Sequence, residues 1–402
     1  MSDSYATASD AAALRGHSVA PFVSAGLAAR ETAPSALAKQ PEWAPRLWSG
    51  CDFPVWLSLL VRNRWAVAPR FWYIAVAITL MSFANTLLRL VESAIYGRAV
   101  RRTKVEPPIF VIGHWRTGTT LLHELMVRDE RFGYPTTYQC LEPNHFLLTE
   151  RLFKRCLGLL MPATRPMDNM KLDLDRPQED EFALCMLGAG SPYLNIAFPN
   201  NSPNTDDHLD LEAATPASRV HWMRVFHGFV QKVAYKTGKR LVLKSPPHTA
   251  RITTLKAMFP DALFIHIVRD PYAVFPSTVN LWQTLHKTQG LQTPIDVELG
   301  ERVLNTFVHM YDKLEAGKAS LSPGQFYELT YEDLIKDPLG EVKNIYDHFG
   351  LGGFAATLPR LQEYLAANKS YETNKYKLSE AERAMVAQRW DKVILRYGYA
   401  AR

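Results

Sequence analysis

Cysteine is scarce in this sequence, and neither sign of charge dominates it. The 402 residues show no C-x-x-C pair and no cysteine–histidine spacing typical of a zinc site. The four cysteines are widely separated, at Cys51, Cys140, Cys156 and Cys185. We therefore expect reduced thiols in a cytosolic compartment, not a disulfide framework. The 46 Lys and Arg residues against 40 Asp and Glu leave a net charge of +6, which suits a local anionic ligand or a membrane surface and not a nucleic acid.

A secretory signal is also missing, because the N-terminal residues have neither a basic region nor an apolar one. A cytoplasmic protein is the expectation. The composition, 47% hydrophobic and 21% charged, is that of a globular chain and excludes disorder throughout. Residues 1–50 are rich in Ala, Ser and Pro, and we predict that they form a mobile tail.

Residues 51–105 are predicted to form an apolar helical segment. Its longest uncharged stretch is the 18 residues from Phe71 to Leu88. As a helix this stretch would be about 27 Å long, slightly less than the roughly 30 Å of a bilayer core. Arg70 and Arg89 flank it, and a basic cluster at 98–104 suits an anionic leaflet. The pattern leaves open a helix on the membrane, a helix across it, or packing on the domain or on a second copy, but membrane attachment through residues 53–105 is expected.

Strands and helices alternate from residue 106 onward. Short β-branched runs predict strands at 108–113, 240–244, 262–268 and 326–329. Helix-start signals stand at Thr215-Pro216, at Asp337-Pro338 and at Ser379 with Glu382, where a capping box opens the last predicted helix. We predict an α/β fold of P-loop type, with a mainly parallel sheet flanked by helices. Residues 106–350 would form this domain and 351–402 a C-terminal helical tail.

A glycine-containing loop, 113–120, follows the first predicted strand and opens a helix. Backbone N–H groups of such a loop and the helix N-terminus bind phosphate. The G-x-x-x-x-G spacing is that of a Walker A loop, but Thr119 replaces its lysine and the basic residue is Arg116, inside the loop. No apolar strand ends in a Walker B aspartate, so the sequence does not predict a bound metal.

A second basic element follows the third predicted strand. Arg269 ends that strand, and Ser277 lies eight residues later in the next helix. An arginine at the carboxyl end of a parallel strand lies where open α/β sheets bind ligands, and its planar fork suits phosphate. Together with the loop, it indicates a ligand that carries two separated phosphate-like groups.

These two elements resemble those of the sulfotransferases that use PAPS (3′-phosphoadenosine 5′-phosphosulfate), in particular the bacterial branch with N-terminal extensions. The loop PIFVIGHWRTGTTLL is similar to the 5′-phosphosulfate loop, and VRDPYAVFPSTVNLW to the 3′-phosphate motif. LVLKSPPH and the segment 331–334 also recur in that family. The resemblance covers roughly residues 106–350 and implies a sulfotransferase with PAPS as co-substrate and no metal.

The resemblance also implies roles for individual residues. Sulfuryl transfer needs neutralisation of the departing phosphate and a base for the acceptor hydroxyl. The base would be Glu142, which matches the glutamate of some bacterial members, or His248, which lies near the histidine of cytosolic members. The 3′-phosphate would be bound by Arg269 and Ser277. The 5′-phosphosulfate would be bound by the loop and by the end of the second strand: Arg116, Thr117, Gly118, Thr119, Thr120 and Lys244.

The acceptor is a small molecule, a glycan or a lipid with a hydroxyl group, and the sequence does not choose among them. Its pocket is expected between Cys140 and Pro203 and near Trp282. His145 and the acidic run 179–181 are weaker candidates, since such a run is usually the solvated start of a helix. A P-loop kinase or hydrolase and a non-catalytic, membrane-associated PAP-binding protein stay open as alternatives, and so does a homo-oligomer.

Overall fold

A five-stranded parallel sheet forms the centre of the molecule in the computed structural model, which describes residues 46–157, 173–201, 208–368 and 376–399. The strand order is β2-β3-β1-β4-β5, and every neighbouring pair is parallel. The strands are β1 (Ile109–Ile112), β2 (Phe132–Gly133), β3 (Arg240–Lys244), β4 (Leu263–Val268) and β5 (Phe326–Thr330). The four predicted strands and the α/β class are confirmed. Only β2 was not predicted, because two residues show no periodicity.

Alternate residues of β1 pack into two separate cores. Phe110 and Ile112 contact the core on one face of the sheet, whereas Ile109 and Val111 belong to the other. The first core includes residues of helices α7 (Pro216–Thr237), α8 (Ile252–Met258) and α10 (Leu299–Lys318). The second includes residues of α3 (Thr119–Met126), α12 (Pro338–Phe349) and α13 (Phe354–Ala367). Helices therefore cover both faces, as a buried parallel sheet requires.

Two of the predicted helix-start signals form the expected capping hydrogen bonds. The Thr215 side chain accepts a hydrogen bond from the Ser218 amide at the start of α7, and left-handed Gly238 (φ 65°) ends that helix. The capping box of Ser379 and Glu382 opens α14 (Glu380–Arg389). One expectation was wrong, because α14 is followed by a further short helix, α15 (Asp391–Arg396).

The other helical segments connect these elements. They are η1 (Leu47–Gly50), α1 (Phe53–Arg62), η2 (Pro69–Phe71), α2 (Trp72–Arg102), α4 (Thr137–Leu141), α5 (Phe146–Leu157), α6 (Asp180–Met186), η3 (Pro192–Ile196), η4 (Pro199–Asn201), η6 (Pro246–Ala250), α9 (Pro271–Gln289) and α11 (Tyr331–Lys336). Because η1 is buried, with Trp48 fully enclosed, the tail predicted to reach residue 50 was placed too far along the chain. Residues 1–45 lie outside the described part.

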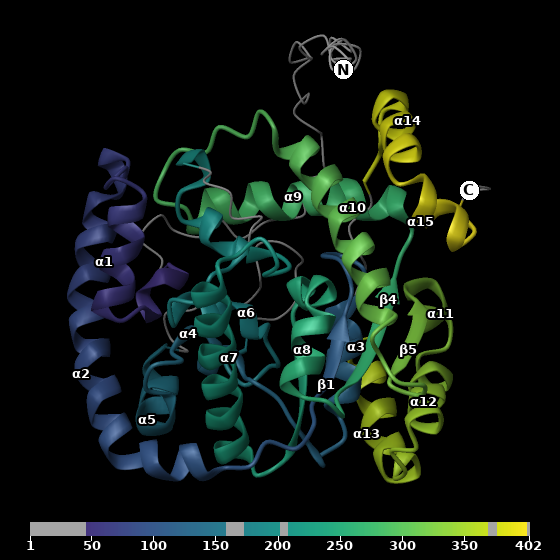
Figure 1. Cartoon of the computed structure of the whole chain (residues 1–402), viewed down its shortest axis with the longest axis horizontal. Helices are drawn as coiled ribbons and strands as arrows, with labels where there is room; N and C mark the ends of the chain where they lie inside the picture. The colour runs from purple at the N-terminus through teal and green to yellow at the C-terminus, as the bar shows by residue number, and fades with distance from the viewer. Residues whose placement is uncertain (1–45, 158–172, 202–207, 369–375, 400–402) are drawn as a thin grey trace, which may run out of the picture. The chain divides into compact units, whose positions relative to one another are not determined.

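The N-terminal apolar segment forms two helices, α1 and α2, that pack against each other, and α2 also packs against α5 and α7 (Figure 1). Helix α2 has 31 residues and continues beyond the uncharged stretch, and Glu92 in this continuation is buried and forms an ion pair with Lys232 of α7. Two other polar residues of α2, Ser82 and Asn85, are also buried against the protein. Asn85 donates to the carbonyls of Ser49 and Cys51, at 2.7 and 3.0 Å. The inner face of this helix is therefore partly polar.

A third core joins the N-terminal helices to the glycine-containing loop, residues 113–120. It contains Trp56 of α1, Ile78 of α2, Tyr193 of η3 and Leu285 of α9, and Trp115 of the loop belongs to it as well. Cys51 and Cys185, also in this core, are unpaired thiols, as predicted. The N-terminal helices and the loop therefore share one packed core.

Candidate active site at the carboxyl edge of the sheet

The loop between β1 and α3 is tightly curled, and glycine is required at both its ends. Gly113 has a φ of +153° and Gly118 a φ of +100°. A β-carbon at Gly113 would lie 2.6 Å from the Ile267 carbonyl oxygen, and one at Gly118 only 2.4 Å from the Tyr331 ring. Arg116 also adopts a left-handed conformation, with a φ of 70°. Alternating backbone conformations of this kind turn successive N–H groups toward one concavity, which is the arrangement that binds an anion.

The two predicted basic elements meet at this loop. Arg116 donates from Nε to the Ser277 hydroxyl at 2.8 Å, and Arg269 donates from Nη1 to the Arg116 carbonyl at 3.1 Å. The Arg269 guanidinium also lies 4.3 Å from the centre of the Tyr331 ring. Arg116 therefore contacts both Ser277 and Arg269, and Arg269 also contacts Tyr331, so the two motifs and the segment beginning at Tyr331 meet at one place. Their roles in holding phosphate stay predictions.

Lys244 approaches the same loop from the end of β3. Its ammonium group lies 3.4 Å from the Thr120 hydroxyl and 2.8 Å from the Glu179 carboxylate. The other carboxylate oxygen of Glu179 accepts a short hydrogen bond from the Tyr193 hydroxyl. Trp115 closes the chain of contacts, because its indole donates to the Tyr193 oxygen at 2.7 Å. The loop, β3, the segment before α6 and η3 thus converge on one carboxylate.

Glu142 lies in a different set of contacts. It ends α4, and its carboxylate is 3.4 Å from His145 Nε2. His145 in turn hydrogen-bonds Asn85 of α2 at 3.1 Å. Burial raises the pKa of Glu142, and the hydrogen bond and charge of His145 oppose that rise. No contact between Glu142 and the loop is found in the described part of the chain, and its role as a base stays a prediction.

His248 lies in η6 and is completely enclosed. Its Nε2 is 2.8 Å from Asp180, and both side chains have no exposed surface. The rings of Phe110, Phe226 and Trp222 surround the imidazole. This enclosure leaves no room for an acceptor hydroxyl, so the geometry does not favour His248 as the base, although the assignment stays a prediction.

The acidic run 179–181 does begin a helix, α6, but the expectation that it is solvated was wrong. Asp180 and Glu181 are fully buried. Asp180 contacts His248, and Glu181 forms two hydrogen bonds with Arg251 at 2.7 and 3.0 Å. Asp180, Glu181 and His248 are close enough to one another to hold a cation, although Glu181 is already paired with Arg251.

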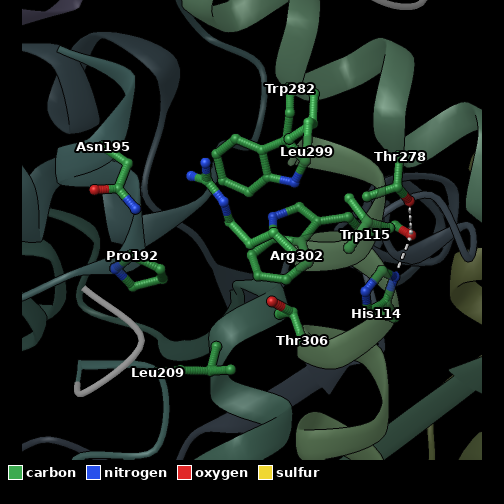
Figure 2. A pocket seen from close by; sticks show the side chains of 11 residues that line it. His114, Trp115, Pro192, Asn195, Leu209, Thr278, Trp282, Leu299, Arg302 and Thr306 are labelled. Carbon is green, nitrogen blue, oxygen red and sulfur yellow. Dashed lines mark hydrogen bonds between the residues drawn. The ribbon is translucent and has the colours of Figure 1, made fainter. Parts of the chain in front are cut away.

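A small pocket borders the loop on its aromatic side (Figure 2). The labelled side chains of Trp115, Trp282 and Arg302 gather on one side of it and face Pro192 and Asn195. The ring centres of Trp115 and Trp282 are 5.4 Å apart, and the two rings meet edge to face. Burial lowers the pKa of neighbouring His114 to about 4, so that ring is neutral at physiological pH. Pro192, Asn195 and Trp282 come from the segments in which the acceptor pocket was expected.

Sequence reasoning missed two residues of this site and misjudged a third. Trp115 and Tyr193 were not singled out, and Glu179 was taken as part of a solvated run. Trp115 does lie within the loop motif, so its position next to Arg116 could have marked it as a candidate. Nothing in the sequence, however, indicates that Glu179 and Tyr193, 14 residues apart, meet at the end of β3.

Comparison with known proteins agrees with this geometry. Residues 107–355 match the model of the sulfotransferase family. The chain is 49% identical over 366 residues to the omega-hydroxy-beta-dihydromenaquinone-9 sulfotransferases Stf3 of Mycobacterium bovis and Mycobacterium tuberculosis, covering 91% of this chain and 94% of each relative.

Solved structures show the same fold. The sulfotransferase STF1 from Mycobacterium tuberculosis superposes with a TM-score of 0.59 at 21% identity, covering 84% of this chain and 91% of that one. STF9 from Mycobacterium avium gives a TM-score of 0.60 at 21% identity, covering 86% and 96%. The family match and the 49% identity together confirm the prediction from the motifs: the chain belongs to the sulfotransferase family and is a PAPS-dependent sulfotransferase.

Proposed function

We propose that the chain transfers the sulfuryl group of PAPS to a terminal hydroxyl of an apolar isoprenoid quinone. The observation that carries the donor half is the direct contact of Arg116 with Ser277 and Arg269 at the loop that Lys244 also approaches. The acceptor class rests on the 49% identity, over 91% of the chain, to enzymes named for omega-hydroxy-beta-dihydromenaquinone-9. The aromatic pocket borders the same loop, on the side where the acceptor would react.

In this proposal the residues have separate tasks. The loop N–H groups, Thr119 and Thr120 bind the 5′-phosphosulfate, and Arg269 and Ser277 bind the 3′-phosphate. Arg116 and Lys244 neutralise the charge that develops on the departing phosphate. No metal ion is needed for this, because guanidinium, ammonium and backbone N–H groups supply the positive charge.

The test measures transfer of the radiolabelled sulfuryl group of PAPS to omega-hydroxy-beta-dihydromenaquinone-9 in detergent micelles. A sugar with free hydroxyl groups serves as the comparison acceptor. We expect a sulfated lipid whose formation survives EDTA. Binding of PAP without transfer to either acceptor would contradict the proposal and favour a non-catalytic binding protein. Transfer to the sugar alone would overturn the acceptor class.

We also propose that the outer face of α1 and α2 lies on a membrane leaflet, where such a lipid acceptor resides. The helix region Pro69–Arg102 is long and apolar enough to cross a membrane, and only 22% of its most apolar stretch is buried. Large apolar side chains are exposed on it at a helical spacing: Trp72, Val76, Leu80, Phe83, Leu87 and Leu90. The buried polar side chains of this helix, Ser82, Asn85 and Glu92, instead face the protein, which reverses the usual pattern of a surface helix.

The distribution of positive charge favours contact of this face with a membrane leaflet. Exposed basic residues stand at both ends of the apolar strip, with Arg62, Arg64 and Arg70 at one end and Arg98, Arg101, Arg102 and Lys104 at the other. Basic residues at the edges of an apolar helix face attract anionic headgroups. Helix α2 packs on α1, α5 and α7, so the proposal is that it lies along the leaflet and does not cross it.

Vesicle flotation tests this face. The chain should float with vesicles that contain phosphatidylglycerol, and Leu80→Glu/Leu87→Glu should remain in the dense fraction. Leu395→Glu, at an exposed leucine of α15 (69% exposed), is the matched control and should float. A chain that stays in the dense fraction would contradict the proposal. So would a stable dimer in solution that the double substitution dissociates.

A further inference from the structure

Glu179 stands out among the titratable groups around the loop. It lies before α6, and its side chain is 16% exposed, whereas Lys244 beside it is 1% exposed. One carboxylate oxygen is 2.8 Å from the Lys244 ammonium, and the other accepts from the Tyr193 hydroxyl. The group is thus held at both oxygens, next to the cation that faces Thr120 of the loop.

Tyr193 fixes the orientation of this carboxylate and links it to the acceptor pocket. Burial and the negative charge of Glu179 raise the pKa of the Tyr193 hydroxyl, which therefore stays protonated and donates. The Tyr193 ring lies 6.1 Å from that of Trp115 and 5.8 Å from that of Trp282. Both tryptophans line the pocket. Glu179 is consequently located between the donor cation and the aromatic side of the site.

We infer that Glu179 is the base that accepts the proton of the acceptor hydroxyl. In the transfer, a bond forms between the acceptor oxygen and sulfur, and the bond between sulfur and the phosphate oxygen breaks. The electron pair of the broken bond leaves on the phosphate of PAP, next to Lys244. The hydroxyl proton passes to the Glu179 carboxylate. This inference rests on the proposed function, because it assumes that the acceptor reacts at the loop.

The other candidates are less well placed for this task. His248 has no exposed surface and contacts Asp180, inside a ring of aromatic side chains. Glu142 contacts His145, in a group that extends to α2 and away from Lys244. Glu179 alone of the three is in direct contact with a residue that also reaches the loop.

The experiment compares Glu179→Gln with the parent chain in sulfuryl transfer and in calorimetric binding of PAP. We expect turnover to fall about 100-fold or more, the usual contribution of a general base. PAP should bind equally well or more tightly, because a negative charge near the anion-binding loop is removed. Glu212→Gln, at an exposed carboxylate that contacts Lys313, is the matched control and should change neither quantity.

Turnover of Glu179→Gln within threefold of the parent would overturn the inference. Loss of turnover together with more than tenfold weaker PAP binding would also overturn it, because the carboxylate would then maintain the donor site. A 100-fold loss of turnover in Glu142→Gln, with Glu179→Gln active, would give the role to Glu142. If the parent chain itself transfers no sulfuryl group to the lipid, the proposed function fails, and that outcome is distinct from all of these.

Discussion

The donor side and the acceptor side of the site are built in different ways. On the donor side, Arg116, Ser277 and Arg269 come from two continuous segments, each of which passes from a strand into a helix. On the acceptor side, Glu179 and Tyr193 come from separate segments that only tertiary packing brings together, and Lys244, from a third segment, links them to the donor side. Phosphate binding depends on local backbone geometry, which recurs wherever the motif does, whereas acceptor chemistry depends on side chains delivered by the surrounding layers.

The largest loss of turnover is expected from substitution of Lys244, the residue that contacts both the donor side and the acceptor side. In Lys244→Ala, turnover should fall by roughly 10²–10³-fold, because charge on the departing phosphate loses its neutralising group. PAP binding should weaken much less, since the loop and Arg269 remain. Steady-state transfer and calorimetry measure the two effects.

Lys256→Ala, at a lysine of α8 that contacts Ser322 and Gln325, is the control and should leave both quantities unchanged. If Lys244→Ala lowered PAP affinity as much as it lowered turnover, Lys244 would belong to the donor side alone. The distinction between the two sides would then break down at this residue.

A smaller effect, confined to the donor side, is expected at Arg269. Arg269→Ala should weaken PAP binding by about 1.5–3 kcal/mol, the scale of a lost hydrogen bond to a charged group. Calorimetric titration with PAP measures this directly. The control is Arg360→Ala, at an arginine exposed on α13 that pairs with Glu130 at 2.7 Å. Equal affinity in Arg269→Ala and the parent would remove Arg269 from the 3′-phosphate site.

The smallest effect is expected far from both sides, at Glu328 on β5. Its carboxylate lies 2.8 Å from His266. Burial raises the pKa of Glu328, but the hydrogen bond and charge of His266, with Lys318 and Tyr397, outweigh that and lower the pKa to about 2. Because the folded-state pKa lies below the unfolded one, the stabilisation is present at neutral pH and is lost as pH falls from about 4.5 toward 2.

Glu328→Gln should therefore lower the free energy of unfolding by about 1 kcal/mol at neutral pH, with a difference that shrinks in acid. Denaturant unfolding at several pH values tests this, and PAP binding should not change. A difference that grew as pH fell would show that the carboxylate is not stabilised in its charged form.

The features that the sequence predicted are local ones, and the features that it did not predict depend on residues far apart in the chain. The strands at 108–113 and 240–244, the loop and the Arg269–Ser277 spacing were predictable because short-range patterns encode them. The burial of Glu181 was not, since its partner Arg251 is 70 residues away and nothing in either local pattern marks the pair. The pairing of Glu92 with Lys232 was not predicted for a related reason, because the two residues lie on helices far apart in the sequence.

The most direct test of the proposed donor site is a crystal structure with PAP bound. The account predicts that one end of the ligand contacts Arg269 and Ser277 through its 3′-phosphate. The 5′-phosphate should lie on the backbone of residues 116–120, within reach of Lys244. A bound PAP whose phosphates lie elsewhere, with Arg269 still against Tyr331 and free of phosphate, would contradict the account.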